Sequence, residues 1–556
     1  MIPIKKPVKG DQFINRISLL NNLKRIYMLN NAVLIGQRRI GKSSIAEEFL
    51  RKLPDGENIK LRFSVNSNIG PPGRFAIRLL RDFLIAYISE FKSNILLNVD
   101  EIEINPLILV ELSNKINSKS LSKLSIFLNN YYPAKPDNER TVLERILMFL
   151  EHFSIEMKLK TALVLDEFQS ISELDNFSNF GKGKVFAFLE DITSKQENVW
   201  YLFTGSAVRM MEEIFEGSES PFYGRLELFK VGTFNKEDTI TLGHKCCKKP
   251  ISGEAINYLY NLSKGHPFYV NVIISAADKF SGDKNYIDRN HIEEAFLSEI
   301  TIGDLDYHCK YLFDTSVGRI GQGATHKELL RVLSKGPSSL TSLANQIGRK
   351  TGNLSLPLRK LNQLDLIDNI DKQFFITDHI LETWLRYVYG HNEPVIDNIR
   401  KSIRKNYQEL IATLNTQTGL FFESYMREML QKFNGQRFEN KPLPKFDKVD
   451  AINLADNEGL VFGKPSNIEI DSLCLGSENW ICEFKYTNKN VRKKDITILL
   501  KKKILIETLF NIKVNKIIYI SKSPFSEESI NSEVKCITLF DVNKLLNLLN
   551  MKKLNE

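Results

Sequence analysis

The stretch Gly36-Gln37-Arg38-Arg39-Ile40-Gly41-Lys42-Ser43, followed by Ser44, decides the fold of the first part of the chain. It matches the pattern GxxxxGK[ST] at every fixed position. The apolar run 31–35 before it predicts a short buried strand, and the amphipathic run 44–52 after it predicts a helix. This strand, glycine loop and helix are the context in which the pattern cradles phosphate. The alternative is a chance match of the pattern in a loop, but this would not explain the strand before it and the helix after it.

Each residue type in this loop suits a phosphate ligand. The glycines let backbone N–H groups turn toward phosphate oxygens, and the N-terminus of the following helix adds partial positive charge. Lys42 would place its charge on the β- and γ-phosphates, and the Ser43 hydroxyl would ligate Mg²⁺. Residues 36–44 are therefore predicted to bind ATP together with Mg²⁺.

A second apolar run supplies two carboxylates to the same predicted sheet. Residues 161–165 predict a strand that ends in Asp166 and Glu167. An aspartate at a strand end can hold the water shell of Mg²⁺, and a glutamate beside it can polarise the attacking water. The pair indicates hydrolysis of ATP; the alternative is an acidic cap on a strand.

A third apolar run, 199–203, leads to the polar residues Thr204 and Ser206. In sheets of this kind that strand end lies beside the γ-phosphate, so either residue is a candidate sensor. Arg225, in the turn Pro221-Phe-Tyr-Gly-Arg, is a candidate arginine finger that would act on a neighbouring subunit of a homo-oligomer. The alternative is a surface arginine at a turn.

The composition is that of a soluble globular protein of several domains. At 556 residues the chain is long enough for three or four domains, and 42% apolar and 26% charged residues argue against a disordered or fibrous chain. No uncharged apolar run reaches the about 18 residues that a membrane helix needs, and no apolar segment follows the basic N-terminus, so we expect no membrane contact and no signal peptide. The six cysteines show no CxxC spacing, which favours reduced thiols in the cytoplasm.

The middle of the chain is predicted to be mostly helical. The stretch 70–155 indicates an inserted helical subdomain of unknown role. Its helical patterns cover residues 75–91, 107–128 and 139–153. Later helices are predicted over 255–263, 268–280 and 288–300.

Three short helices and a strand pair follow, and they predict a winged helix-turn-helix. The elements cover residues 325–334, 339–347, 353–364 and 367–376. Such a module would bind DNA through Arg349, Lys350, Arg359 and Lys360. The alternative is that it packs on the ATPase and relays the nucleotide state.

Together these motifs resemble the archaeal-type P-loop ATPases, relatives of the STAND branch of the AAA-like NTPases. The resemblance covers residues 1–390 and rests on Lys6-Pro-Val-Lys-Gly10 with Phe13-Ile-Asn-Arg16, GQRRIGKSS (36–44), LVLDEFQ (163–169), TGS (204–206), PFYGR (221–225) and Gly265-His-Pro-Phe268. It implies a parallel sheet of five strands, bound ATP with Mg²⁺, and a helical lid. In that lid the turn ending at Pro267 would approach the nucleotide.

Positive charge is concentrated toward the C-terminus. The chain carries a net charge of +9, and residues 401–556 account for +6 of it, with 25 Lys and Arg against 19 Asp and Glu. Residues 485–503 alone hold eight Lys and Arg against one Asp. This pattern favours a polyanion partner such as DNA; a solvated basic helix face is the alternative.

A hairpin in this basic region carries a hydrolytic pattern. The strands predicted over 467–475 and 480–486 place Asp471 beside Glu483 and Lys485, which share one face of their strand. The two carboxylates would hold Mg²⁺ against a scissile phosphate, and the lysine would stabilise the attacking water or the developing charge. The alternative is that Lys485 only pairs with a carboxylate across the hairpin.

With its neighbours this hairpin resembles the PD-(D/E)XK nuclease superfamily, in the form found at the C-terminus of these ATPases. The neighbours are a helix from about residue 416, a basic helix over 493–509, and strands over 516–521 and 534–539. Asp471, Glu483 and Lys485 match the superfamily motif, and Glu423 matches the acidic residue that its first helix often carries. Such domains sometimes keep the fold and lose the chemistry.

The sequence therefore predicts an α/β protein of four parts. These are a P-loop ATPase domain (1–232), a helical lid (233–310), a winged helix-turn-helix (311–395) and a nuclease-like domain (396–556). We expect an ATP-driven switch that controls a Mg²⁺-dependent nuclease-like effector acting on DNA, and the resemblance implies a role in defence against foreign DNA or in mobile-element processing. The alternatives are an ATP-dependent DNA-binding regulator with an inert nuclease fold, and a signalling scaffold whose basic surface binds protein.

Overall fold

The structure, a computed structural model, describes residues 3, 6–65, 69–92, 104–131, 138–177, 184–319, 324–391, 393–456, 466–487, 489–529 and 533–554. The chain forms two compact units, Met1–Ile403 and Arg404–Glu556. Each unit has its own sheet and its own core, and each is described by itself below. In the described ranges no helix combines the length and the apolar character needed to cross a membrane.

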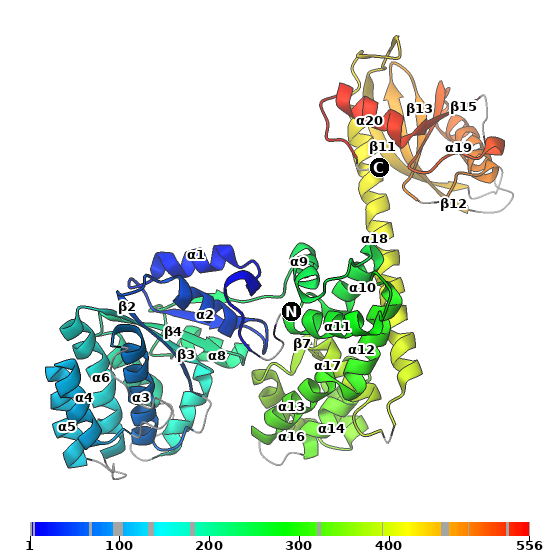
Figure 1. Ribbon diagram of the computed structural model, residues 1–556. Helices are drawn as coiled ribbons and strands as arrows, with labels where there is room; N and C mark the ends of the chain where they lie inside the picture. Colours follow the sequence, from blue (N-terminus) through cyan, green and yellow to red (C-terminus); the bar gives the residue numbers. More distant parts are fainter. Residues whose placement is uncertain are drawn as a thin grey trace. The chain divides into compact units, whose positions relative to one another are not determined.

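The first unit is built on a parallel sheet of five strands in the order β2-β3-β4-β1-β5. Figure 1 labels β2, β3 and β4 of this sheet. The strands are β1 (Ala32–Ile35), β2 (Asn58–Ser64), β3 (Lys160–Asp166), β4 (Val199–Gly205) and β5 (Glu227–Lys230). All neighbouring pairs are parallel. Helices cover both faces, which is why the central strands are continuous apolar runs without polar alternation. The predicted α/β fold with a five-stranded parallel sheet is confirmed.

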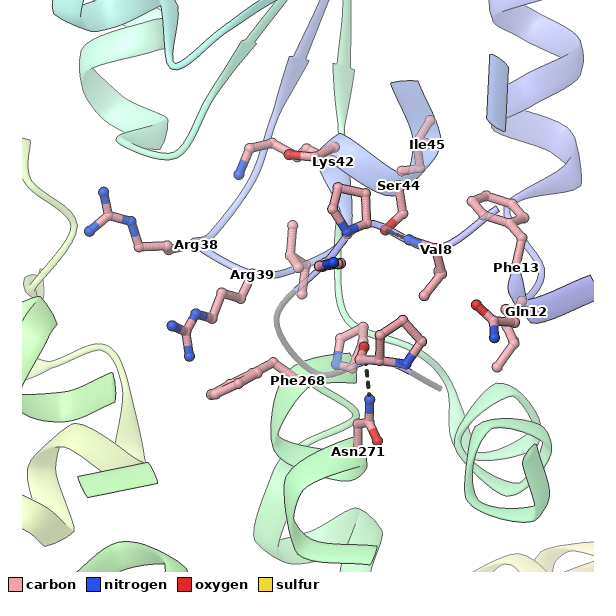
Figure 2. A pocket seen from close by; sticks show the side chains of 18 of the residues that line it. Val8, Gln12, Phe13, Arg38, Arg39, Lys42, Ser44, Ile45, Phe268 and Asn271 are labelled. Carbon is pink, nitrogen blue, oxygen red and sulfur yellow. Dashed lines mark hydrogen bonds between the residues drawn. The ribbon is translucent and has the colours of Figure 1, made fainter. Parts of the chain in front are cut away.

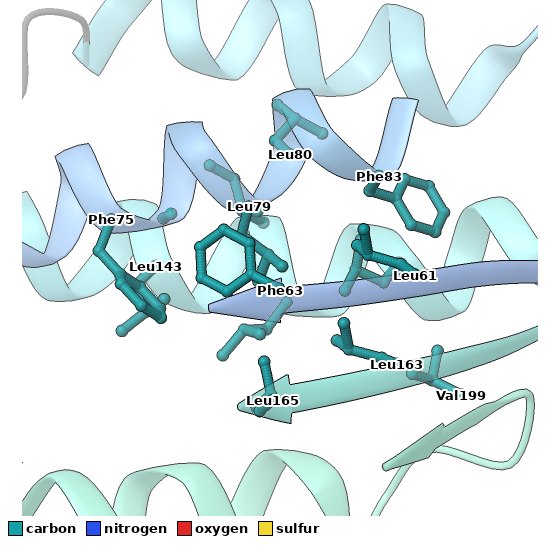
Figure 3. Packing of buried hydrophobic residues seen from close by; sticks show 14 of the residues in the cluster. Leu61, Phe63, Phe75, Leu79, Leu80, Phe83, Leu143, Leu163, Leu165 and Val199 are labelled. Atoms are coloured by element: carbon teal, nitrogen blue, oxygen red, sulfur yellow. The ribbon is translucent and has the colours of Figure 1, made fainter. Parts of the chain in front are cut away.

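The two faces of this sheet have different cores. On one face, α1 (Ile17–Ile26) and α2 (Lys42–Lys52) pack against Leu34, Ala162 and Leu202. On the other face, β2 and β3 place Phe63 and Leu165 against α3 (Pro72–Phe91), as Figure 3 shows. Full burial of such an aromatic or aliphatic side chain contributes about 1.5–3 kcal/mol. The sheet is therefore held between two apolar layers, and its carboxyl edge stays fixed.

The inserted region belongs to the second of these cores. Its helices are α3, α4 (Pro106–Ile116), α5 (Lys119–Tyr131) and α6 (Glu139–Met157), and all four contribute buried side chains to the cluster that contains the sheet. The single helical pattern predicted over 107–128 is in fact two helices. Asn117 ends α4 in the left-handed conformation at φ 61°, and the Ser118 hydroxyl accepts a hydrogen bond from Leu121 N at the start of α5.

Five helices follow the sheet, and then a small mixed region. The helices are α9 (Lys236–Cys246), α10 (Gly253–Ser263), α11 (Pro267–Phe280), α12 (Arg289–Ile302) and α13 (Asp304–Arg319). The mixed region contains α14 (Ala324–Leu333), β6 (Ser338–Ser339), α15 (Leu340–Ile347), α16 (Thr351–Gln363), β7 (Ile367–Ile370), β8 (Gln373–Ile376) and α17 (His379–Tyr387). Its strands form an antiparallel sheet in the order β6-β8-β7.

The second unit holds a mixed sheet in the order β11-β12-β13-β14-β15. The strands are β11 (Phe446–Asp456), β12 (Ser466–Gly476), β13 (Trp480–Lys485), β14 (Lys516–Ser521) and β15 (Val534–Thr538), with a short pair, β9 (Arg437–Phe438) and β10 (Lys441–Pro442), before them. The C-terminal part of α18 (Ile396–Gln431) and α20 (Leu539–Leu548) pack on one face, and α19 (Lys493–Phe510) on the other. The helix predicted to start near residue 416 is longer, because α18 begins at Ile396.

Candidate functional site

The loop between β1 and α2 has a backbone that needs its glycines. A Cβ on Gly36 would lie 2.6 Å from the carbonyl oxygen of Val231, so no side chain fits there. Gly41 has φ +107°, a conformation that L side chains rarely adopt. Immediately after it α2 begins at Lys42, so the first N–H groups of the helix face the loop. Residues 36–44 therefore form the strand–loop–helix turn expected of a phosphate-binding loop.

Lys42 is buried and lies over its own loop. Its Nζ donates hydrogen bonds to the carbonyl oxygens of Gly36 at 2.8 Å and Gln37 at 2.9 Å. Burial lowers the pKa of Lys42 to about 8, although the nearby carboxylates of Glu167 and Asp166 act in the opposite direction. Two neutral carbonyl groups are poor compensation for a buried ammonium, so this site favours the approach of an anion.

Asp166, at the end of β3, is the centre of a polar cluster. Its Oδ2 accepts hydrogen bonds from Ser43 Oγ at 3.0 Å and from Arg62 Nη2 at 2.6 Å, and its Oδ1 accepts one from Thr204 Oγ1. Burial raises the pKa of Asp166, but the hydrogen bond from Thr204 and the charge of Arg62 outweigh it and hold the pKa below its ordinary value. A charged carboxylate beside a serine hydroxyl is an oxygen set that suits Mg²⁺.

Glu167 is held in one orientation by two donors. It has φ 58°, and its Oε2 accepts hydrogen bonds from Gln169 Nε2 at 2.6 Å and Ser206 Oγ at 2.7 Å. The two predicted sensors therefore bind the two carboxylates, Thr204 to Asp166 and Ser206 to Glu167. Glu167 also lines the pocket described next, and its role toward an attacking water stays a prediction.

A pocket of about 610 Å³ opens in front of this loop (Figure 2). Three of the segments that line it are the N-terminal segment with Val8 and Phe13, the loop itself with Arg38 to Ser44, and the start of α11 with Pro267 and Phe268. The N-terminal segment is tied to α2, since Val8 N donates to Ser44 Oγ at 3.1 Å. An apolar wall beside a phosphate loop leaves room for a flat, uncharged group next to the phosphates.

The turn before α11 touches the loop directly. The His266 ring Nε2 lies 3.1 Å from the carbonyl oxygen of Arg38, and burial lowers the pKa of His266 to about 4, so this imidazole is neutral at pH 7. Gly265 has φ +73°, and a Cβ there would collide with the carbonyl oxygen of Phe234 at 2.0 Å. The structure thus places Pro267 at the pocket, where the family resemblance expected it.

Two residues stand apart from the predicted arrangement. Arg225 does not line the pocket; its guanidinium forms an ion pair with Glu190 on α7 (Lys184–Thr193). Its role as an arginine finger stays a prediction. Arg62, on β2, is a pocket residue that the sequence analysis missed. The only signal for it was its place in a strand that alternates apolar residues with Lys60 and Arg62.

In the second unit the predicted acidic residues come together. Ser472 pairs with Cys482 in the antiparallel register, so continuation of that register places Asp471 opposite Glu483. Asp471 Oδ2 accepts a hydrogen bond from Phe484 N at 2.7 Å. Burial and the neighbouring charge of Asp471 raise the pKa of Glu423, on α18, which places this third carboxylate in the same neighbourhood. Lys485 is exposed beside them.

Lys502 is a further charged residue of this cluster, and sequence reasoning missed it. It is mostly buried, and its Nζ lies 2.6 Å from Glu483 Oε2. Burial first, and then the charge of Asp471, raise the pKa of Glu483 to about 7 despite this lysine. Over the described ranges, no group of three His, Cys, Asp or Glu side chains is arranged to hold a metal ion. The carboxylates of Asp471, Glu483 and Glu423 and the lysines Lys485 and Lys502 are therefore neighbours here, without forming such a metal-binding group.

Comparisons with known proteins agree with the fold of the first unit. No family model matches the chain. The Walker-type ATPase PABY2304 of Pyrococcus abyssi is similar in structure with a TM-score of 0.50 and 16% identity, over 69% of this chain and 99% of that one. The ORC2 protein of Aeropyrum pernix gives a TM-score of 0.40 at 12% identity, over 72% of this chain and 98% of that one. The first likeness shows the fold: the chain contains the fold of a P-loop ATPase.

A relative by sequence is itself without a known function. The uncharacterized protein MJECL04 of Methanocaldococcus jannaschii is 23% identical over 316 residues, which make up 53% of this chain. The match spans 65% of that relative's length.

Proposed function

We propose that this protein is an ATP-binding and ATP-hydrolysing switch that controls a Mg²⁺-dependent nuclease-like domain acting on DNA. The observation that carries the ATPase part is that Lys42, Ser43 and Glu167 line one pocket of about 610 Å³, and that Asp166 binds the hydroxyl of Ser43 beside it. A lysine that lacks an anionic hydrogen-bond partner, a serine hydroxyl and two carboxylates are the groups that hydrolysis of a nucleoside triphosphate requires.

Each residue has a separable role in this proposal. Bound Mg²⁺ would neutralise charge on the phosphates, and Ser43 and Asp166 would hold it. When a nucleotide binds, the Lys42 ammonium group leaves the carbonyl oxygens of Gly36 and Gln37 and donates its hydrogen bonds to phosphate oxygens instead. Glu167, kept in place by Gln169 and Ser206, accepts a proton from the attacking water.

The region 324–376 is proposed to be a winged helix that senses the state of this site. Helix α8 (Val208–Glu216) starts two residues after Ser206, and Arg209 Nη2 forms an ion pair with Asp368 on β7 at 2.6 Å. Arg209 N also lies 3.4 Å from the Asp365 carboxylate, which therefore caps the helix. A shift of Ser206 would move the start of α8 and with it the contacts of Arg209 to region 324–376. This connection supports the proposal that the region relays the nucleotide state.

The same region also exposes a basic surface. Arg349, Lys350 and Arg359 are exposed, while Leu354 and Leu358 on α16 are buried. Positive side chains on the outer face of the third helix of such a module suit contact with DNA phosphates. Relay and DNA binding are compatible, because different residues serve them.

For the second unit we propose a nuclease-like fold with Asp471, Glu483 and Lys485 at its centre. A second candidate function, an ATP-dependent DNA-binding regulator with an inert nuclease fold, is favoured by one observation. Lys502 already forms an ion pair with Glu483. The raised pKa of Glu483, about 7, also leaves much of this carboxyl group protonated at neutral pH. A carboxylate engaged in this way is a weak metal ligand.

Purified protein incubated with plasmid DNA, with and without ATP and Mg²⁺, separates these candidates. Cleavage that needs Mg²⁺ and changes with ATP supports the controlled nuclease. ATP-dependent binding without cleavage supports the regulator. Binding should also weaken steeply with salt, because phosphate contacts release counterions. An absence of ATP hydrolysis in every condition contradicts the proposal as a whole.

A further inference from the structure

Arg62 lies where a cation is needed in the proposed magnesium site. Its guanidinium donates to Asp166 Oδ2 through Nη2 at 2.6 Å and through Nε at 3.1 Å. Ser43 Oγ donates to the same oxygen at 3.0 Å. Arg62 therefore shares an oxygen atom with the serine that would hold Mg²⁺.

A second carboxylate faces the same guanidinium. Glu47 lies on α2, one turn after Ser43, and its Oε1 is 3.2 Å from Arg62 Nη1. Arg62 thus bridges the helix that follows the loop and the strand that ends in Asp166. With side chains 27% and 8% exposed, Arg62 and Asp166 form a largely buried pair, in which removal of one partner leaves an uncompensated charge.

The pocket offers space into which the Arg62 guanidinium can move when it leaves Asp166. Arg62 lines the pocket together with Lys42 and Ser43. A guanidinium and Mg²⁺ at one carboxylate oxygen repel each other strongly, because two unit charges 4 Å apart at a partly buried site cost about 4 kcal/mol and the double charge of the metal doubles this cost. Either a metal ion or the Arg62 guanidinium therefore binds the Asp166 carboxylate, and each excludes the other.

We infer that Arg62 is the built-in counter-cation of the magnesium site, which keeps Asp166 charged and oriented without metal and gives way to Mg²⁺ when a nucleotide binds. The inference rests on the proposed function, because it takes the ligand to be a nucleotide with Mg²⁺. It assigns to Arg62 a positioning role: the arginine acts through Asp166, and it also screens incoming phosphates from that carboxylate when metal is absent.

The test compares nucleotide binding with and without metal. Wild type and Arg62→Ala are titrated with a fluorescent ATP analogue in Mg²⁺ and in EDTA. Mg²⁺ replaces the missing charge, so affinity in Mg²⁺ should change less than about threefold; in EDTA the phosphates meet a bare Asp166, and affinity should fall by about tenfold or more. Arg62→Lys keeps a cation and should behave like wild type, and Glu47→Gln keeps the contact with Asp166 and should do the same.

A second readout needs no nucleotide. Mg²⁺ alone should raise the melting temperature of Arg62→Ala by a few degrees and leave that of wild type unchanged, because only the variant has an unoccupied carboxylate site. In an Asp166→Asn background, Arg62→Ala should lose this response to Mg²⁺. If Arg62→Ala does not fold, as judged by circular dichroism, Arg62→Gln replaces it.

The outcomes distinguish this inference from the proposed function. An equal loss of affinity in Mg²⁺ and in EDTA, together with no stabilisation by Mg²⁺ alone, would overturn the role of Arg62 and leave the ATPase standing. If wild type binds no nucleotide in Mg²⁺, the proposed function fails. The melting experiment then still decides whether Arg62 and Mg²⁺ compete for Asp166.

Discussion

Replacing Lys42 by methionine should make the first unit more stable while it removes nucleotide binding. The reason is the burial of a charge whose hydrogen bonds, within the described ranges, go to the carbonyl oxygens of Gly36 and Gln37. A lysine whose pKa is about 8 instead of 10.5 costs the folded state about 3 kcal/mol as long as it stays protonated, since each tenfold change in proton affinity is worth about 1.4 kcal/mol. The two hydrogen bonds to Gly36 and Gln37 return about 1 kcal/mol each. Lys42→Met should therefore gain about 1–2 kcal/mol at pH 7.

This gain should depend on pH in a defined direction. Below pH 8 the lysine is protonated in both the folded and the unfolded chain, and its full cost is present. Between pH 8 and 10.5 the folded chain loses the proton first, so wild-type stability rises with pH and the gap to Lys42→Met closes. For a unit of this size the gap at pH 7 corresponds to about 1–3 °C in the first melting transition.

The assay is differential scanning calorimetry of both proteins at pH 7 and at pH 9.5, with and without ATP and Mg²⁺. Lys52→Met is the matched control, because Lys52 lies on the same helix but is half exposed and should change little. ATP should stabilise wild type and the control but not Lys42→Met. A Lys42→Met protein that melts below wild type at pH 7, or a gap that is the same at both pH values, would refute the reasoning.

Four further outcomes are expected. Glu167→Gln should bind ATP as wild type does and hydrolyse it at least about a hundredfold more slowly in a steady-state phosphate-release assay, because the general base is lost; a wild-type rate would remove Glu167 from the mechanism. Arg225→Ala mixed with Glu167→Gln should regain hydrolysis if the arginine acts between subunits, and confirmed mixed oligomers without any gain would exclude that role. Asp471→Ala should abolish cleavage of plasmid DNA, as seen on a gel, and leave ATP hydrolysis near normal; undiminished cleavage contradicts the nuclease site. Lys502→Met should destabilise the second unit by about 1–3 kcal/mol at pH 8 and by less at pH 6, because Glu483 takes up a proton at the lower pH. Urea unfolding at the two pH values measures this difference in stability. An equal loss of stability at both pH values would show that Glu483 is not the group involved.

The proposed nucleotide site is the part of the molecule whose residues could be predicted from the sequence. Its residues lie in short contiguous motifs, and each motif sits at the end of an apolar run. Because parallel strands end at one edge of a sheet, the motifs at 36–44, 166–167 and 204–206 had to meet there. The same logic brought Asp471 next to Glu483, since a hairpin sets its own register.

The residues that balance these charges could not be found in this way. Arg62 shares its strand with Lys60, and Lys502 stands in a run of three lysines. Nothing in the local sequence distinguishes either residue from its basic neighbours. Only the packing of β2 against β3, and of α19 against the second sheet, brings them onto Asp166 and Glu483.

The sequence by itself determined the local chemistry: a phosphate loop, strand-end carboxylates, an acidic hairpin and the helices around them. These follow from periodicity and from backbone demands that a few neighbouring residues satisfy, such as the left-handed turn at Gly41. Tertiary structure alone decided which cation pairs with which carboxylate, and that Arg225 pairs with Glu190 away from the pocket. The physical reason is that charge pairing and burial act through space between segments far apart in the chain, and they depend on side-chain directions that no local pattern encodes.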